Sequence, residues 1–225
     1  KAPDQLPKVP SAGWIALLDA GDGSPGAIGV PAGPAGTMPI EVPLTDNGVH
    51  DLDAMATAIR PDTSLVYLCN PNNPTGTLVD QRRLERFLDE VPEDVLVLVD
   101  EAYHEYVTDP GYRSMLPQAP ERPNLIATRT FSKVYALGSL RVGYAVAQAS
   151  TIEQLRKAQA PFSVNDLGQA AAIASLDSPD ELKERVVLNT AGREWFEARL
   201  AALGVRSVAS PANLVYLRLG APTEV

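Results

Sequence analysis

The sequence predicts an α/β protein built on a mostly parallel sheet that is covered by helices on both faces. From residue 41 onward, short apolar runs alternate with stretches of helical spacing. The apolar runs are nearly continuous, which is typical of strands buried on both faces of a parallel sheet. A composition of 45% hydrophobic and 21% charged residues over 225 residues indicates a globular chain long enough to bury a core.

The first forty residues do not follow this pattern. The stretch "DAGDGSPGAIGVPAGPAG" is crowded with Gly, Pro and Ala and has neither helical nor strand periodicity. We therefore expect an irregular segment over 1–40. We do not expect a dinucleotide-binding loop there, because no strand–glycine turn–helix frame surrounds the glycines.

Strands and helices follow in order along the rest of the chain. Asp51 and Asp80 are each expected to cap a helix, whose buried faces are Leu52, Met55 and Ile59 in the first and Leu84, Phe87 and Leu88 in the second. Further helices are expected at 151–159, 166–176 and about 180–203. Strands are expected at 40–44, 64–70, 94–103, 124–130, 144–147 and 213–219.

Charge and cysteine content exclude several classes of protein. The net charge of −9 and the lack of a basic stripe argue against a nucleic-acid partner, although a few local cations can still bind a small anion. No apolar stretch is long enough to cross a membrane, and we expect no membrane partner. Cys69 is the only cysteine, which fits a reducing compartment and predicts a cytoplasmic protein.

Polar residues follow three of the predicted strands. They lie at 70–76, 100–103 and 130–133. Ligands of parallel α/β sheets bind at the carboxyl ends of the strands, so we expect these three segments to meet in one crevice. For each segment a plainer interpretation stays open: a rigid strand-to-helix connection in "CNPNNPTGT", a helix cap at Asp100, and a solvated surface lysine at Lys133.

Four motifs taken together resemble a known family. They are "NPNNPTGT", "VDEAYHEYV", "TRTFSKVYALGSLRVGYAVA" and "PFSVNDLGQAAAIASLD". In this combination the chain resembles the fold-type I pyridoxal-phosphate (PLP) enzymes, and among them the class I/II aminotransferases of the histidinol-phosphate aminotransferase group. The resemblance implies a PLP-binding large domain over 41–177. Residues 178–225 would then form a long helix and the start of an incomplete small domain.

The resemblance implies catalytic roles for residues at the strand ends. Lys133 would bond to the aldehyde of the cofactor and then act as general acid and base. Asp100 would pair with the ring nitrogen and keep it protonated, which strengthens the ring as an electron sink. Tyr103 and Asn73 would donate hydrogen bonds to the phenolic oxygen of the ring.

The resemblance also implies a phosphate site in the same stretch as the lysine. Thr130, Ser132 and Arg141 would hold the cofactor phosphate, and the planar fork of a guanidinium suits two phosphate oxygens at once. No metal is expected, because His50 and His104 lack metal-ligand spacing.

Three parts that such enzymes usually contain are not found. One is an N-terminal Gly-Ser or Gly-Ala turn whose amides bind the cofactor phosphate. An aromatic residue that stacks on the cofactor ring is expected near 25–28, where the sequence has Pro25, Gly26, Ala27 and Ile28. An arginine that binds the substrate carboxylate is expected beyond Val225, and Arg218 is not a convincing substitute. We expect the printed sequence to be incomplete; the alternative is a naturally reduced relative.

The predicted function is that of a PLP-dependent aminotransferase of amino-acid biosynthesis, acting as a homodimer. It would move an amino group between an amino acid of the histidinol-phosphate or aromatic type and a 2-oxo acid. Two alternatives stay open: a PLP-dependent decarboxylase or lyase of the threonine-phosphate type, and a non-catalytic relative on the same fold.

Overall fold

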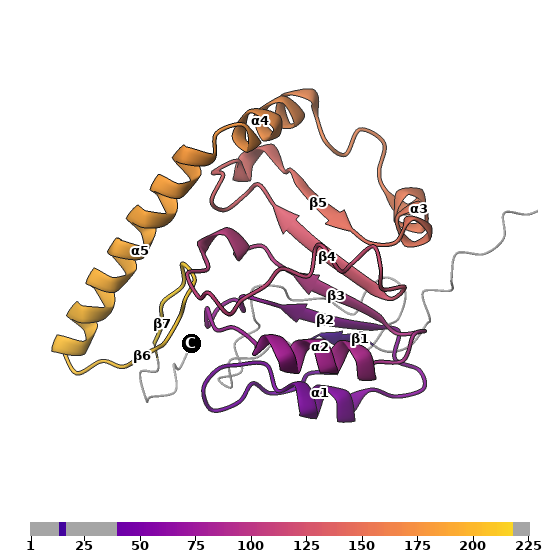
Figure 1. The fold of residues 1–225 in the computed structure, drawn as a ribbon, viewed down its shortest axis with the longest axis horizontal. Coiled ribbons are helices and arrows are strands. Elements are labelled where there is room, and N and C mark those ends of the chain that lie inside the picture. Colours follow the sequence, from indigo (N-terminus) through magenta and orange to yellow (C-terminus); the bar gives the residue numbers. More distant parts are fainter. Residues whose placement is uncertain (1–13, 17–39, 218–225) are drawn as a thin grey trace, which may run out of the picture.

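A five-stranded sheet forms the centre of the protein (Figure 1). The computed structural model describes residues 14–16 and 40–217. The strands run in the order β1-β2-β3-β4-β5 across the sheet. Their bounds are β1 Trp14–Ala16, β2 Leu65–Cys69, β3 Leu96–Asp100, β4 Leu125–Thr130 and β5 Gly143–Val146. A separate two-stranded sheet consists of β6 Ser207–Val208 and β7 Tyr216–Leu217.

The first four strands are parallel, and the fifth is antiparallel. The pairing of β2 with β3 sets Cys69 beside Asp100, and that of β3 with β4 sets Asp100 beside Thr128. β5 runs antiparallel to β4, because the 131–142 connection contains no crossover helix that would return the chain for a parallel strand. The strand expected at 144–147 therefore exists, but as an exposed edge strand and not as a buried parallel one.

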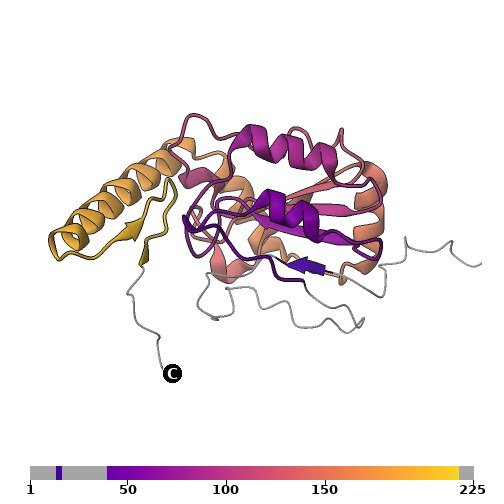
Figure 2. The same cartoon turned by 90° about the horizontal axis from the view of Figure 1, so that it is seen from below.

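Two helices cover one face of the sheet and enclose the main core (Figure 2). They are α1 (Leu52–Ala58) and α2 (Gln81–Glu90). Each begins at the predicted cap: Asp51 accepts from the N–H of Ala54 at 3.1 Å, and Asp80 accepts from the N–H of Arg83 at 3.0 Å. The predicted helix faces are buried at Leu52, Met55, Leu84, Phe87 and Leu88, against Val66, Leu68, Val97 and Val99 of the sheet.

The opposite face of the sheet carries half-buried side chains. Leu65, Tyr67, Leu96, Leu98 and Asp100 all belong to it. Helices were expected on both faces of the sheet. Among the described residues, α1 and α2 cover one of these two faces.

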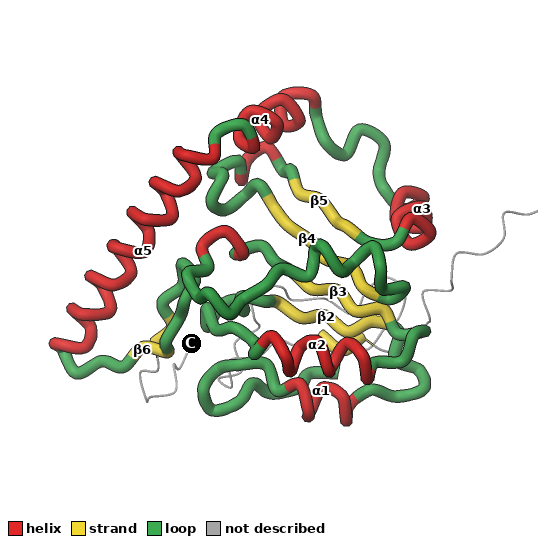
Figure 3. The backbone as a smooth tube through the Cα atoms, viewed as in Figure 1, coloured by secondary structure: helices red, strands yellow, loops and turns green. Residues whose placement is uncertain are grey.

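The remaining helices follow β5 in the chain. They are α3 (Ala149–Ala158), α4 (Asp166–Leu176) and the long α5 (Pro179–Ala202), all close to their predicted bounds. Helices α3 and α4 lie near the β5 edge, whereas α5 runs from α4 to β6 (Figures 1 and 3). Two short 3-10 turns, η1 (His104–Tyr106) and η2 (Gly138–Leu140), follow β3 and β4. Within the described ranges, none of the helices is long and apolar enough to cross a membrane.

Several sequence predictions are wrong in detail. Residues 40–44 form no strand, while Trp14–Ala16 within the supposedly irregular 1–40 segment pairs with β2. The strand expected over 213–219 includes only Tyr216–Leu217 of the described residues. Trp195 and Phe196 of α5 are 63% and 45% exposed. The positions near 25–28 and Arg218 lie outside the described residues.

Candidate active site

The loop after β2 is a closed turn that presents one amide side chain. The N–H of Asn72 donates to the carbonyl of Thr77 at 2.9 Å, and the N–H of Gly76 donates to the carbonyl of Asn72 at 2.7 Å. The hydroxyls of Thr75 and Thr77 both donate to the carbonyl of Gly48, at 2.9 and 2.7 Å. These buried bonds hold the loop rigidly, while Asn73 at its tip remains half-exposed.

Three of the predicted site residues meet beside this loop. Asn73 donates from Nδ2 to the hydroxyl of Tyr103 at 3.2 Å. Nζ of Lys133 lies over the ring of Tyr103, 5.0 Å from its centroid. An amide, a phenol and an exposed amine from three separate strand ends therefore share one place, as the crevice rule predicts.

Asp100 ends β3 one strand away from the loop. Its Oδ2 accepts from the hydroxyl of Tyr67 at 2.7 Å, and its Oδ1 accepts from the N–H of Ala102 at 3.0 Å. Burial, followed by the charges of Cys69 and Asp100, raises the pKa of the Tyr67 phenol far above its usual range, so the hydroxyl remains a donor. Tyr67 could not be singled out from the sequence, because a tyrosine inside an apolar strand has no local signal that separates it from a packing residue.

The predicted phosphate residues lie in the β4–β5 connection. The hydroxyl of Thr130 accepts from the N–H of Ser132 at 3.0 Å and donates to the carbonyl of Val142 at 3.4 Å. The exposed guanidinium of Arg141 donates to the carbonyl of Gly138 at 3.0 Å. Within the described residues, no hydrogen bond joins Arg141 to the group formed by Asn73, Tyr103 and Lys133, so its place at a phosphate stays a prediction.

A second, small core supports this connection from behind. Phe131, Val142 and Ala172 are buried together, with Tyr135, Leu137, Leu140 and Val164 against them. The buried Gly168 of α4 allows the close approach, since a Cβ there would lie 2.8 Å from Cγ2 of Val142. Arg185 of α5 donates to the carbonyl of Val134, next to Lys133, at 2.9 Å. Helices α4 and α5 thus help to place the lysine.

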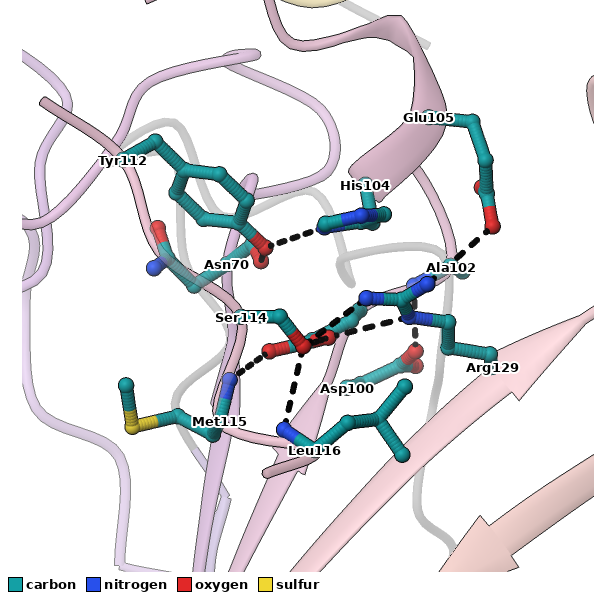
Figure 4. Close-up of polar contacts among 11 residues, drawn as sticks. Asn70, Asp100, Ala102, His104, Glu105, Tyr112, Ser114, Met115, Leu116 and Arg129 are labelled. Atoms are coloured by element: carbon teal, nitrogen blue, oxygen red, sulfur yellow. Dashed lines mark hydrogen bonds and ion pairs between the residues drawn. The ribbon is translucent and has the colours of Figure 1, made fainter. Parts of the chain in front are cut away.

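A buried ion cluster ties the turn after β3 to β4 (Figure 4). Arg129 pairs with Glu101 at 3.1 Å and with Glu105 at 3.6 Å, and all three side chains are at most 13% exposed. Glu101 also accepts from the hydroxyl of Ser114 at 2.6 Å and from the N–H of Met115. The cluster fixes the segment that holds Asp100 and Tyr103 against the strand that leads to Lys133.

The two histidines lie outside this chemistry. His104 lies against Tyr112, with Nδ1 3.3 Å from its hydroxyl, and burial lowers the pKa of its imidazole to about 4 with a further contribution from Arg129. Nε2 of His50 donates to the carbonyl of Cys69 at 2.9 Å. In the part of the chain that the structure describes, no group of His, Cys, Asp and Glu side chains could hold a metal ion.

The donor set fits a pyridoxal-type cofactor. An aldehyde needs an exposed amine, which Lys133 offers, and a protonated ring nitrogen needs a carboxylate, which Asp100 offers. A phenolic oxygen needs donors such as the amide of Asn73 and the hydroxyl of Tyr103, which already lie 3.2 Å apart. All four groups sit at the carboxyl ends of neighbouring strands.

Comparisons with known proteins agree with this geometry. The family model "Aminotransferase class I and II" matches residues 33–225. An aromatic amino acid aminotransferase of Streptomyces avermitilis is 49% identical over 84% of this chain and 53% of its own length. A histidinol-phosphate aminotransferase of Brevibacillus brevis is 46% identical over 80% of this chain and 49% of its own length.

A solved structure of a histidinol-phosphate aminotransferase is also similar to this chain. The histidinol-phosphate aminotransferase of Sinorhizobium meliloti, in complex with pyridoxal-5'-phosphate, superposes with a TM-score of 0.78 at 32% identity, over 83% of this chain and 50% of that one. The chain spans about half the length of the curated relatives it matches. With its motifs, its strand-end geometry and these likenesses in accord, the chain belongs to the class I and II aminotransferases.

Proposed function

We propose that the protein is a PLP-dependent aminotransferase that moves an amino group between an amino acid and a 2-oxo acid. The proposal rests on one observation: the side chains of Asn73, Tyr103 and Lys133 lie close together. They do so beside the end of β3, whose last residue is Asp100. When bound, the cofactor supplies an aldehyde for amines and a ring that accepts electrons. Names of the relatives favour an aromatic or histidinol-phosphate-type amino acid as the amino donor.

Each side chain then has a defined task. Nζ of Lys133 would hold the cofactor through its aldehyde and, as a free amine, would move the proton to and from the α-carbon of the substrate. The carboxylate of Asp100 holds the proton on the ring nitrogen. The hydroxyl of Tyr103 and the amide of Asn73 orient the ring by hydrogen bonds to its phenolic oxygen. Ser132 and Arg141 bind the phosphate, and Thr130 shapes the turn around Ser132 through its hydroxyl bond.

The proposal also covers the domain organisation and the oligomeric state of the whole protein. It includes a large domain over 41–177, a small domain from 178 onward, and a homodimer. A cytoplasmic location is supported by the single, buried and free Cys69. Sedimentation of the purified protein tests the dimer.

The decisive experiment follows the absorbance of lysine-bound cofactor in the near-visible range. The purified protein mixed with pyridoxal phosphate should develop this band, and Lys133→Ala should lack it and lose turnover. Addition of an aromatic amino acid alone should convert the band to that of the amine form, and a 2-oxo acid should restore it. A Lys133→Ala variant with normal turnover would refute the proposal.

The same experiment separates the alternatives. A decarboxylase or lyase would form the band but would not leave the cofactor as the amine when the amino acid is added alone. A non-catalytic relative would show no band with the parent protein.

A further inference from the structure

Tyr67 and Asp100 lie on adjacent strands and share one face of the sheet. The parallel register of β2 and β3 pairs Tyr67 with Leu98 and Cys69 with Asp100. Because side chains alternate along a strand, Tyr67 and Asp100 point to the same, half-buried face, two positions apart. The phenol therefore reaches the carboxylate from the neighbouring strand at 2.7 Å.

Both oxygens of Asp100 are held. Oδ2 accepts from Tyr67, and Oδ1 accepts from the N–H of Ala102 at 3.0 Å. A carboxylate with one donor rotates about its χ angles, whereas two donors from different directions fix both oxygens. The β2–β3 ladder already joins the two strands through backbone bonds, so the phenol–carboxylate bond is not needed for strand pairing.

We infer that Tyr67 is a positioning residue, whose hydroxyl holds the carboxylate of Asp100 in the orientation that receives the protonated ring nitrogen of the cofactor. The inference rests on the proposed function and adds a residue to it. The phenol suits this task because it donates one hydrogen bond and carries no charge, so it orients the carboxylate without neutralising it as an arginine or lysine would.

The raised pKa of Tyr67 supports this role. Burial is the main cause, and the result is a phenol that stays protonated through the working range of the enzyme. The hydroxyl is thus a permanent donor, and the direction of its bond with Asp100 does not reverse with pH.

The test compares Tyr67→Phe with Tyr112→Phe. Both changes remove one hydroxyl from a largely buried tyrosine; that of Tyr112 bonds to the carbonyl of Asn70 at 3.2 Å and not to Asp100. Two quantities are measured: the dissociation constant of pyridoxal phosphate, and the rise in melting temperature that the cofactor causes. By analogy with partners that orient metal ligands, Tyr67→Phe should weaken cofactor binding about 10-fold and reduce the melting-temperature rise.

The control gives the contrasting result. Tyr112→Phe should leave the dissociation constant within about 2-fold of the parent, and any stability loss should lower the melting temperatures of the cofactor-free and cofactor-bound protein equally. The inference is overturned if Tyr67→Phe binds cofactor as tightly as the parent, or lowers both melting temperatures equally. Failure of the proposed function is a separate outcome, in which the parent itself forms no lysine-bound absorbance.

Discussion

Lys133 and Arg141 lie near the two ends of one connection that folds back on itself. The N–H of Phe131 donates to the carbonyl of Val142 at 3.0 Å, and that of Leu137 donates to the carbonyl of Phe131 at 2.9 Å. Arg141 has a left-handed backbone with φ 56° and ψ 47°. Such a conformation is unfavourable for a residue with a Cβ, and such residues cluster at ligand-binding sites, which agrees with the proposed role of Arg141 at the phosphate.

Replacement of Arg141 tests this role at the residue scale. Hydrogen bonds to charged groups contribute about 1.5–3 kcal/mol, so Arg141→Ala should weaken pyridoxal-phosphate affinity roughly 10- to 150-fold. Arg141→Lys should recover only part of the loss, because an ammonium keeps the charge without the planar fork. Equilibrium dialysis of the cofactor gives the three dissociation constants.

A distant arginine serves as the control for this series. Arg122 pairs with Asp89 at 2.7 Å on the surface, away from the strand ends. Arg122→Ala should leave the cofactor affinity unchanged. An Arg141→Ala variant with the same affinity as Arg122→Ala would mean that the phosphate lies elsewhere.

At the scale of elements, α4 is the support of the lysine-bearing connection. Its first turn is capped by Asn165, which accepts from the N–H of Gly168 at 2.7 Å, and the same glycine faces Val142 and the carbonyl of Leu140. On the other side of the site, the cluster of Glu101, Glu105 and Arg129 binds β4 to the turn after β3. The proposed catalytic groups are thus held by two independent contacts, one apolar and one ionic.

A pair of glycine substitutions tests the apolar contact. Gly168→Ala would place a Cβ 2.8 Å from Val142 and 3.3 Å from the carbonyl of Leu140, so it should destabilise the fold by about 1–3 kcal/mol and weaken cofactor binding. Gly192→Ala in α5 meets no atom within 4 Å and should stabilise the helix by about 0.5–1 kcal/mol. Urea unfolding of both variants measures the two changes; a stabilising Gly168→Ala would show that α4 does not press on the connection.

At the scale of the whole molecule, a buried histidine makes the free energy of unfolding depend on pH. Nε2 of His50 must carry the hydrogen, because the carbonyl of Cys69 can only accept. Its Nδ1 is buried without a partner among the described residues, so a second proton there would be unsatisfied. Burial accordingly lowers the pKa of His50 from 6.5 to about 4.

The sign of the pH dependence follows from that shift. Because the folded pKa lies below the unfolded one, the unfolded chain takes up the proton first, and the free energy of unfolding falls as pH drops from 6.5 toward 4. Between pH 7.5 and 5 the loss due to His50 should be about 2 kcal/mol. Denaturant unfolding at a series of pH values should show a shallower decline for His50→Gln; identical slopes would place the acid sensitivity elsewhere.

The local features of the protein could be predicted from its sequence. The caps at Asp51 and Asp80 and the buried runs of β2, β3 and β4 were predicted correctly, because capping and hydrophobic periodicity depend on neighbours in the chain. The positions of Asn73, Asp100, Tyr103 and Lys133 at strand ends followed from the same pattern.

Which side chains meet across the sheet could be seen only in the three-dimensional structure. The bond between Tyr67 and Asp100 joins residues 33 positions apart and exists because β2 and β3 pair in one register. The pairing of Trp14–Ala16 with β2 likewise joins segments that are far apart in the chain. The apolar pattern within one strand indicates that the strand is buried, but not which distant strand becomes its neighbour.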